Sequence, residues 1–105
     1  MSLRAAEPAA PADRPAGKIR IVLAGDSTTA VGSGWGPGFI KCLDDGVECI
    51  NMARGGRSSK SFIAEGSWNK CLDLKPDYVL IQFGHNDQPG HSTERATDAQ
   101  TTYWQ

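Results

Sequence analysis

The sequence predicts an α/β fold, in which a parallel β-sheet carries helices on both faces. Three observations support this prediction. Three short apolar runs rich in β-branched residues, at 18–24, 47–53 and 77–83, have the length and composition of strands. The segments between these runs have helical composition. The runs follow one another at about thirty residues, which is the spacing of β-α-β units with right-handed crossovers.

Each element has its own support in the sequence. The runs "KIRIVLA" at 18–24 and "DYVLIQF" at 77–83 are nearly continuous in hydrophobicity, which is typical of strands buried on both faces. In the first connection, Pro37 stands near the start of a helix and Gly46 follows its end. In the second connection, residues 59–76 offer helical material that closes at a proline.

Length and charge limit the classes of protein to consider. With 105 residues the chain holds one domain at most, and its net charge of −1 argues against nucleic acid or an anionic surface as a partner. No apolar run approaches the eighteen or so residues of a membrane span. We therefore expect a small or uncharged molecule as the partner, with no nucleic acid and no membrane.

Residues 1–17 are rich in alanine and proline, and we expect them to form a disordered tail before a domain at 18–105. This tail contains no intact signal peptide, because it lacks an apolar core. The compartment stays open. A secreted or periplasmic protein is favoured if a signal peptide was removed, and a cytoplasmic protein otherwise.

The three cysteines, Cys42, Cys49 and Cys71, are an odd number without a CxxC spacing. This pattern supports neither a zinc site nor a full disulfide framework, so no metal is expected. Buried free thiols are the favoured interpretation. A Cys42–Cys71 disulfide between helices would need an oxidising compartment.

Polar residues and glycines follow each of the three predicted strands. The segments are 25–28, "GDST"; 51–59, "NMARGGRSS"; and 84–87, "GHND". Because the carboxyl ends of parallel strands meet at one edge of a sheet, where ligands bind, we expect these segments to lie together. No GxGxxG or GxxxxGK[ST] motif follows any strand, which disfavours dinucleotide and P-loop phosphate sites. A serine, a glycine-rich turn and an asparagine at one edge instead suggest an acyl-transfer site.

The blocks "GDSTTA", "NMARGGRSS" and "GHND" resemble the first three sequence blocks of the SGNH (GDSL-type) hydrolases. Together with "GWGPGF" at 34–39, the sequence of these blocks is similar to the rhamnogalacturonan acetylesterase branch of that family. The resemblance implies a three-layer, flavodoxin-like parallel sheet, of which this chain would supply the first three of five strands. It also implies a serine esterase that acts on O-acetyl esters of carbohydrate, without a metal or organic cofactor.

Carried over residue by residue, the resemblance makes Ser27 the nucleophile. The backbone N–H groups of Ser27 and Gly56 and the side-chain amide of Asn86 would then form the oxyanion hole. The residue types suit these tasks: Ser27 would stand at the start of a helix, Gly56 would let bare backbone approach the substrate, and Asn86 would offer a neutral donor.

The neighbouring residues are expected to support this site. Asp26 should hold the turn through nearby backbone rather than serve as a triad acid, and Asp87 should also hold a turn. Thr28 and Thr29 should cap the following helix. His85 should point to the face opposite Asn86.

The substrate contacts are less specific in the sequence. Arg57 and Ser58, with Trp35 and Trp68, would line a sugar-binding groove, although packing is an equal interpretation of the two tryptophans.

The resemblance also implies a catalytic base from a DxxH block late in the family's sequence, and this chain contains no such block. His91 lies in a polar loop and is expected to be solvated. We therefore expect weak or no turnover from these 105 residues alone, and aggregation or dimerisation through the exposed edge of the third strand. Three alternatives stay open: a non-catalytic carbohydrate-binding remnant, an esterase with another ester substrate, and a phosphate-binding module.

Overall fold

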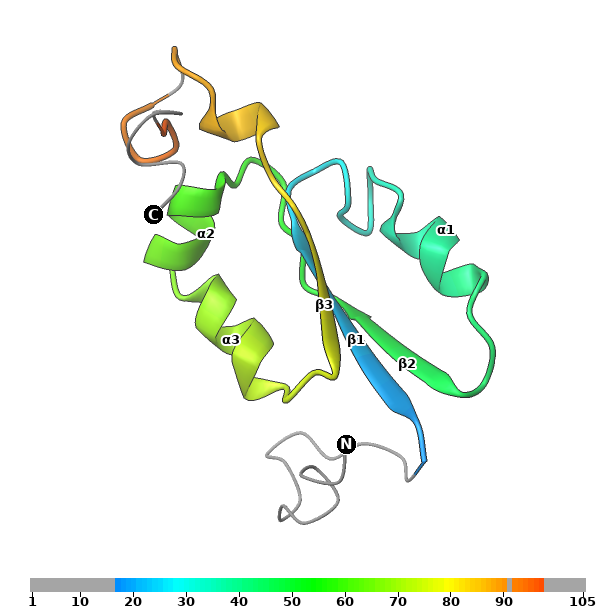
Figure 1. The fold of residues 1–105 in the computed structure, drawn as a ribbon. Helices are drawn as coiled ribbons and strands as arrows, with labels where there is room; N and C mark the ends of the chain where they lie inside the picture. Colours follow the sequence, from blue (N-terminus) through cyan, green and yellow to red (C-terminus); the bar gives the residue numbers. More distant parts are fainter. Residues whose placement is uncertain (1–16, 91, 98–105) are drawn as a thin grey trace.

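A three-stranded parallel sheet forms the centre of the computed structural model, which describes residues 17–90 and 92–97 (Figure 1). The strands are β1 (Ile19–Gly25), β2 (Val47–Asn51) and β3 (Tyr78–Gln82). The prediction of a partial parallel α/β sheet is confirmed, and each strand begins within one residue of its predicted start. His91 and the predicted tail, apart from Gly17, lie outside the described residues.

The central strand of the sheet is β1, because the strand order is β2-β1-β3. Ile19 of β1 pairs with Val47 of β2, and Ile21 of β1 pairs with Tyr78 of β3. All three strands run in the same direction, so their carboxyl ends lie at the same edge of the sheet. The three polar segments begin at this edge.

The connections contain three short helices: α1 (Gly36–Lys41), α2 (Ser59–Ala64) and α3 (Ser67–Asp73). Pro37 occupies the first turn of α1, as predicted, since its missing N–H is not needed there. Gly66 adopts a left-handed φ of 90° and separates α2 from α3. Helices α2 and α3 lie on one side of the sheet and α1 on the other (Figure 1).

The core lies between β1 and the pair α2 and α3. Val22 and Ala24, which alternate along β1 and so share one face, pack with Phe62 of α2 and Cys71 of α3, and all four side chains are buried. Trp68 is partly buried against this cluster, so its role in the described structure is packing. Leu23 is also fully buried, but it points to the opposite face of β1.

The cysteines are free thiols, and they differ in burial: Cys71 is buried, Cys49 is partly buried and Cys42 is exposed. Burial raises the pKa of the Cys71 thiol, so this thiol stays protonated and packs as a small apolar group. The prediction of buried thiols is therefore right for Cys71 and wrong for Cys42.

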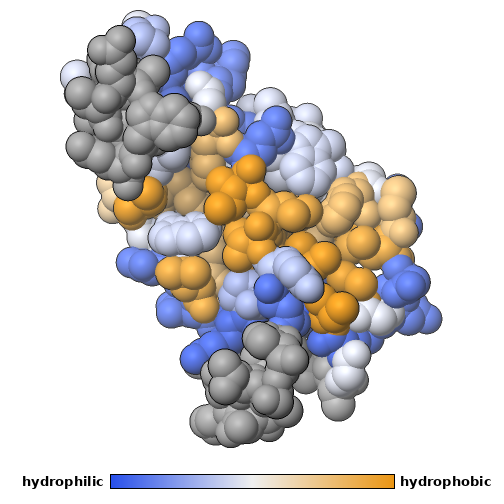
Figure 2. All heavy atoms as spheres, in the orientation of Figure 1, coloured by the Kyte–Doolittle hydropathy of each residue, from blue (hydrophilic) through white to orange (hydrophobic). Residues whose placement is uncertain are grey.

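The prediction that the third strand is buried on both faces is wrong. In β3, Tyr78 is 61% exposed, Leu80 38% and Ile81 60%. Figure 2, in the orientation of Figure 1, shows apolar side chains gathered on the face of the molecule where β3 lies. The cause is the position of β3: it is an edge strand of the described sheet, and α2 and α3 cover one face of the sheet only. Self-association through this edge stays a prediction.

The first strand contains a buried charge that its apolar pattern concealed. Arg20 is only 1% exposed, and its guanidinium donates hydrogen bonds to Glu48 Oε1 at 2.8 Å and to the carbonyl of Leu74 at 2.6 Å. A buried guanidinium needs such partners to offset its desolvation. Arg20 therefore ties β1 to β2 and to the end of α3, near the amino ends of the strands.

Within residues 17–90 and 92–97, no helix is long and apolar enough to cross a membrane.

Candidate functional site

Ser27 lies in a tight turn directly after β1. Asp26, which is buried, makes this turn: its Oδ1 accepts hydrogen bonds from the backbone N–H of Thr28 at 2.9 Å and from the Thr28 hydroxyl at 2.7 Å. The Asp26 carbonyl also accepts the N–H of Thr29 at 3.0 Å. Such an Asx turn reverses the chain without a helix and leaves Ser27 partly exposed at its outer side.

The prediction that Thr28 and Thr29 cap a helix is wrong, as is the helix start expected at Ser27. The next helix, α1, begins only at Gly36. Thr28 bonds back to Asp26 instead, and Thr29 is fully buried beneath the turn. The physical reason is that the N–H of Ala30, which a Thr28 cap would bind, donates instead to the Asp26 carbonyl at 3.1 Å.

The ends of both neighbouring strands hold this turn in place. Asn51, at the end of β2, donates from Nδ2 to the carbonyl of Thr29 at 2.9 Å. Gln82, at the end of β3, accepts a hydrogen bond from the Thr29 hydroxyl at 3.2 Å and another from the indole N–H of Trp35. The serine turn is therefore fixed from both sides of β1, which is what a rigid, exposed hydroxyl requires.

Gly36 lets α1 approach the turn closely. A Cβ atom at Gly36 would lie 2.2 Å from Asn51 Nδ2 and 2.3 Å from the Thr29 carbonyl oxygen, so Gly36→Ala must displace the turn. We expect a loss of about 1–3 kcal/mol in the free energy of unfolding, measured by denaturant titration. Gly38→Ala in the same helix is the matched control, because nothing lies within 4 Å of its Cβ. Equal stabilities of the two variants would contradict this packing.

The glycine-rich segment after β2 lies beside Ser27. The N–H of Arg54 donates to the carbonyl of Gly25 at 3.0 Å, which brings this segment to the end of β1. A Cβ atom at Gly55 would lie 3.7 Å from Ser27 Cβ, so the two residues are neighbours. Gly56 follows with a left-handed φ of 78°, a conformation that favours glycine.

Several backbone donors in this region are free. Among the residues that the structure describes, the N–H groups of Ser27, Gly55 and Gly56 donate to no other described group. Ser27 is partly exposed and Gly55 and Gly56 are exposed, so water satisfies these N–H groups when no ligand is bound. Unused donors beside a serine hydroxyl are available to a ligand oxygen.

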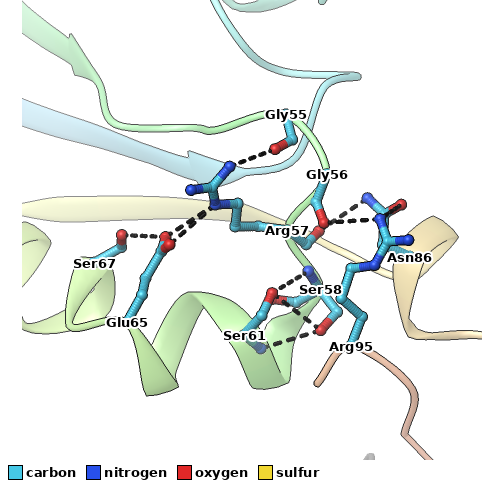
Figure 3. A network of polar contacts seen from close by, with 9 residues as sticks. All are labelled: Gly55, Gly56, Arg57, Ser58, Ser61, Glu65, Ser67, Asn86 and Arg95. Atoms are coloured by element: carbon cyan, nitrogen blue, oxygen red, sulfur yellow. Dashed lines mark hydrogen bonds and ion pairs between the residues drawn. The ribbon is translucent and has the colours of Figure 1, made fainter. Parts of the chain in front are cut away.

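Arg57 fixes the far end of the glycine-rich segment (Figure 3). Its Nε donates to both carboxylate oxygens of Glu65, at 3.0 and 3.2 Å, and its Nη1 donates to the Gly55 carbonyl at 2.8 Å. Desolvation alone would raise the pKa of Glu65. The hydrogen bond from Ser67 and the bond and charge of Arg57 outweigh it, so this pKa lies below its usual value and the ion pair persists at neutral pH.

Ser58 is fully buried as the N-cap of α2. Its hydroxyl accepts the N–H of Ser61 at 3.1 Å, and its own N–H donates to the Ser61 hydroxyl at 2.9 Å. This reciprocal pattern is a capping box. The burial gives no support to the predicted substrate contact of Ser58, whose observed role is to begin the helix.

Residues 85–87 form a short 3-10 helix after β3 rather than the extended segment assumed from the sequence. Asn86 is 5% exposed and donates from Nδ2 to the carbonyl of Arg57 at 3.0 Å, whereas His85 is exposed. Asp87 is buried and accepts the N–H of Ser59 at 3.0 Å, and its carboxylate also accepts the Ser59 hydroxyl. These three bonds join the GHND segment to the glycine-rich segment and to the start of α2.

The structure thus gathers the three segments into a continuous set of contacts. Ser27 adjoins Gly55, the chain continues to Gly56 and Arg57, and Asn86 bonds to the Arg57 carbonyl. Within the described part of the chain, no hydrogen bond reaches the hydroxyl of Ser27, and no group of three or more His, Cys, Asp or Glu side chains could hold a metal ion.

Three further residues shape this site. Asn51 was expected at this edge as part of segment 51–59, whereas Gln82 and Arg95 were not predicted to take part. Asn51 and Gln82 hold the serine turn, and Arg95 donates to Asn86. Asn51 and Gln82 had one signal in the sequence, because each is a polar residue at the end of an apolar strand. Arg95 had none.

Comparison with known proteins identifies relatives. A family model described as GDSL-like lipase/acylhydrolase matches residues 21–105. A probable rhamnogalacturonan acetylesterase, YesY, of Bacillus subtilis (strain 168) is 42% identical over 93 residues, covering 81% of this chain and 43% of that protein. Rhamnogalacturonan acetylesterase RhgT of the same organism is 41% identical over 85 residues, covering 72% and 37%. A rhamnogalacturonan acetylesterase of Emericella nidulans is 46% identical over 70 residues, covering 64% and 28%. The chain therefore spans less than half the length of each of these relatives.

Proposed function

Because the chain belongs to the GDSL-like lipase/acylhydrolase family, we propose that it carries the nucleophile and the oxyanion hole of a serine esterase. The substrate class in this proposal is an O-acetyl ester of a carbohydrate, of the rhamnogalacturonan type named for the three relatives. The observation that most supports the proposal is the set of unused N–H groups at Ser27 and Gly56, beside the buried amide of Asn86.

In the proposed reaction, the Ser27 hydroxyl oxygen attacks the carbonyl carbon of the acetyl ester while its proton passes to a base. The carbonyl oxygen becomes an oxyanion, which accepts hydrogen bonds from the N–H groups of Ser27 and Gly56 and from Asn86 Nδ2. Collapse of this intermediate breaks the ester C–O bond, and the sugar hydroxyl leaves with a proton. Water then hydrolyses the acetyl-serine and releases acetate.

The donors suit this task for a physical reason. Charge develops on the carbonyl oxygen only in the transition state. Fixed N–H groups that donate to no protein acceptor therefore stabilise the transition state more than they stabilise the bound ester. Asn86 uses one N–H of its amide on the Arg57 carbonyl, and a second N–H on the same nitrogen remains for the oxyanion.

The base for Ser27 comes, in this proposal, from the DxxH block that the family resemblance implies. His85 is not proposed as the base, since it is exposed and its neighbour Asn86 is the residue that turns inward. The reaction as written needs no metal or organic cofactor.

Trp35 is the residue we propose as the sugar-facing aromatic. It is 39% exposed, and its backbone N–H donates to the carbonyl of Thr28 at 2.8 Å, which places it next to the serine turn. Aromatic faces at such positions pack against the apolar face of a sugar ring. Arg57 stays in the proposal as a partly exposed cation that follows Gly56 in the glycine-rich segment.

A fluorophosphonate probe tests this function in the full-length protein that contains the chain. We expect covalent labelling at Ser27, located by peptide mass, and no labelling of Ser27→Ala. Ser92→Ala, which removes an exposed hydroxyl on another segment, should be labelled like the wild type. No labelling of the wild type would favour the carbohydrate-binding remnant. The substrate class is tested separately, by acetate release from acetylated pectin and from acetylated xylan. Equal release from the two would contradict the substrate class.

A further inference from the structure

Arg95 contacts Gly56 and Asn86, two of the three residues proposed to form the oxyanion hole. Its Nη1 donates to the carbonyl of Gly56 at 3.2 Å and to Asn86 Oδ1 at 3.3 Å (Figure 3). Gly56 and Arg95 are far apart in the sequence and belong to different loops, so one guanidinium nitrogen joins two segments of the site.

The contact determines which way the amide of Asn86 points. With Oδ1 on the guanidinium, Nδ2 faces the Arg57 carbonyl, to which it donates at 3.0 Å. The flipped amide would place its NH₂ group against a cation and its oxygen against a carbonyl oxygen. Both of these contacts are repulsive. Only the observed orientation keeps an N–H of Asn86 available to an oxyanion.

The segment that carries Arg95 is itself fixed to the site. The N–H of Thr97 donates to the carbonyl of Asp87 at 2.7 Å, and Lys60 Nζ donates to the carbonyl of Thr93 at 2.8 Å. Thr97 is buried, and its hydroxyl also bonds to Asp87. Arg95 therefore projects from a backbone that is held on the GHND segment and on α2.

We propose that Arg95 is a positioning residue for catalysis: it locks the amide of Asn86 in the orientation that donates to the oxyanion. This inference rests on the proposed esterase function. A guanidinium hydrogen-bonded to the amide oxygen also polarises the amide, which makes its N–H groups stronger donors.

The test uses Arg95→Met in the full-length protein, with kcat and KM measured separately on an acetyl ester. Removing an oxyanion donor costs about 10²–10³ in kcat, so we expect loss of its positioning to cost about tenfold in kcat with KM nearly unchanged. Arg95→Lys, which keeps a cation that can donate, should recover part of the loss. Lys70→Met, which removes an exposed positive charge on α3, is the control and should match the wild type.

A double-mutant cycle with Asn86→Ala separates positioning from general stability. If Arg95 acts through Asn86, Arg95→Met should have almost no further effect on kcat in the Asn86→Ala background. An undiminished tenfold loss in that background would overturn the proposal.

A second readout does not depend on activity. In ¹⁵N spectra, we expect the side-chain amide resonances of Asn86 to shift or broaden in Arg95→Met and to stay unchanged in Lys70→Met. Unaltered resonances in Arg95→Met would overturn the positioning role. A wild-type protein without esterase activity would instead overturn the proposed function, so the two failures are distinguishable.

Discussion

Ser27→Ala is expected to lower kcat for acetyl-ester hydrolysis by about 10⁴–10⁶-fold in the full-length protein, as loss of a catalytic serine typically does. The reason is that no other group can form the acetyl-enzyme, and only water held near the oxyanion donors remains as a nucleophile. Substrate binding should change little, because the serine hydroxyl contributes little contact area. The measurement is steady-state acetate release, with kcat and KM determined separately.

The stability of this variant provides its control. No hydrogen bond from the described residues reaches the Ser27 hydroxyl, so Ser27→Ala should unfold at nearly the wild-type temperature. A variant that keeps activity within tenfold of the wild type would rule out Ser27 as the nucleophile. A variant that unfolds much earlier would show that the hydroxyl serves the fold.

Asn86→Ala is the second large effect that we expect. Loss of one oxyanion donor raises the barrier by about 2.7–4 kcal/mol, equivalent to about 10²–10³ in kcat. Asn86→Asp should be at least as damaging, because it replaces the donor with a negative charge beside the developing oxyanion. KM should stay close to the wild-type value in both variants, since the donor acts mainly in the transition state.

Gln88→Ala is the matched control for the asparagine variants. It alters an exposed amide two residues away, which bonds only to the carbonyl of His85 in the described structure. We expect its kcat to match the wild-type value, because its side chain bonds to none of the proposed donors. Asn86→Ala also removes the bond to the Arg57 carbonyl, so kcat must be compared at a temperature where both variants are folded. Equal kcat values for Asn86→Ala and Gln88→Ala would contradict the proposed donor.

The sheet could be predicted because each strand is recognisable from the residues of its own segment. Runs such as 18–24 are long enough and apolar enough to form buried strands, and Pro37 marks the first turn of α1. The break between α2 and α3 was not predicted. A single glycine is tolerated inside many helices, and only its left-handed backbone at Gly66 ends one.

Contacts between distant residues could not be predicted in the same way. The buried contacts of Arg20 were not predicted, since its partners Glu48 and Leu74 lie 28 and 54 positions away. Ser58 belongs to a motif block, but a motif does not distinguish a buried helix cap from a surface contact. Arg95 lies 39 positions from Gly56, and no spacing in the sequence relates the two residues.

Exposure of β3 shows a further limit. Its residues are apolar enough for a strand buried on both faces, yet burial depends on what covers a strand as well as on its composition. In the described structure β3 lies at the edge of the sheet, and Ile81 is 60% exposed.

The claim on which this account depends is that Ser27, Gly56 and Asn86 surround one reactant oxygen. A crystal structure of the full-length protein with Ser27 phosphonylated measures this directly, since the phosphonyl oxygen stands where the oxyanion would form. We predict that this oxygen lies about 2.7–3.1 Å from the backbone nitrogens of Ser27 and Gly56 and from Asn86 Nδ2. An adduct whose oxygen points into solvent, or contacts neither Gly56 nor Asn86, would contradict the account.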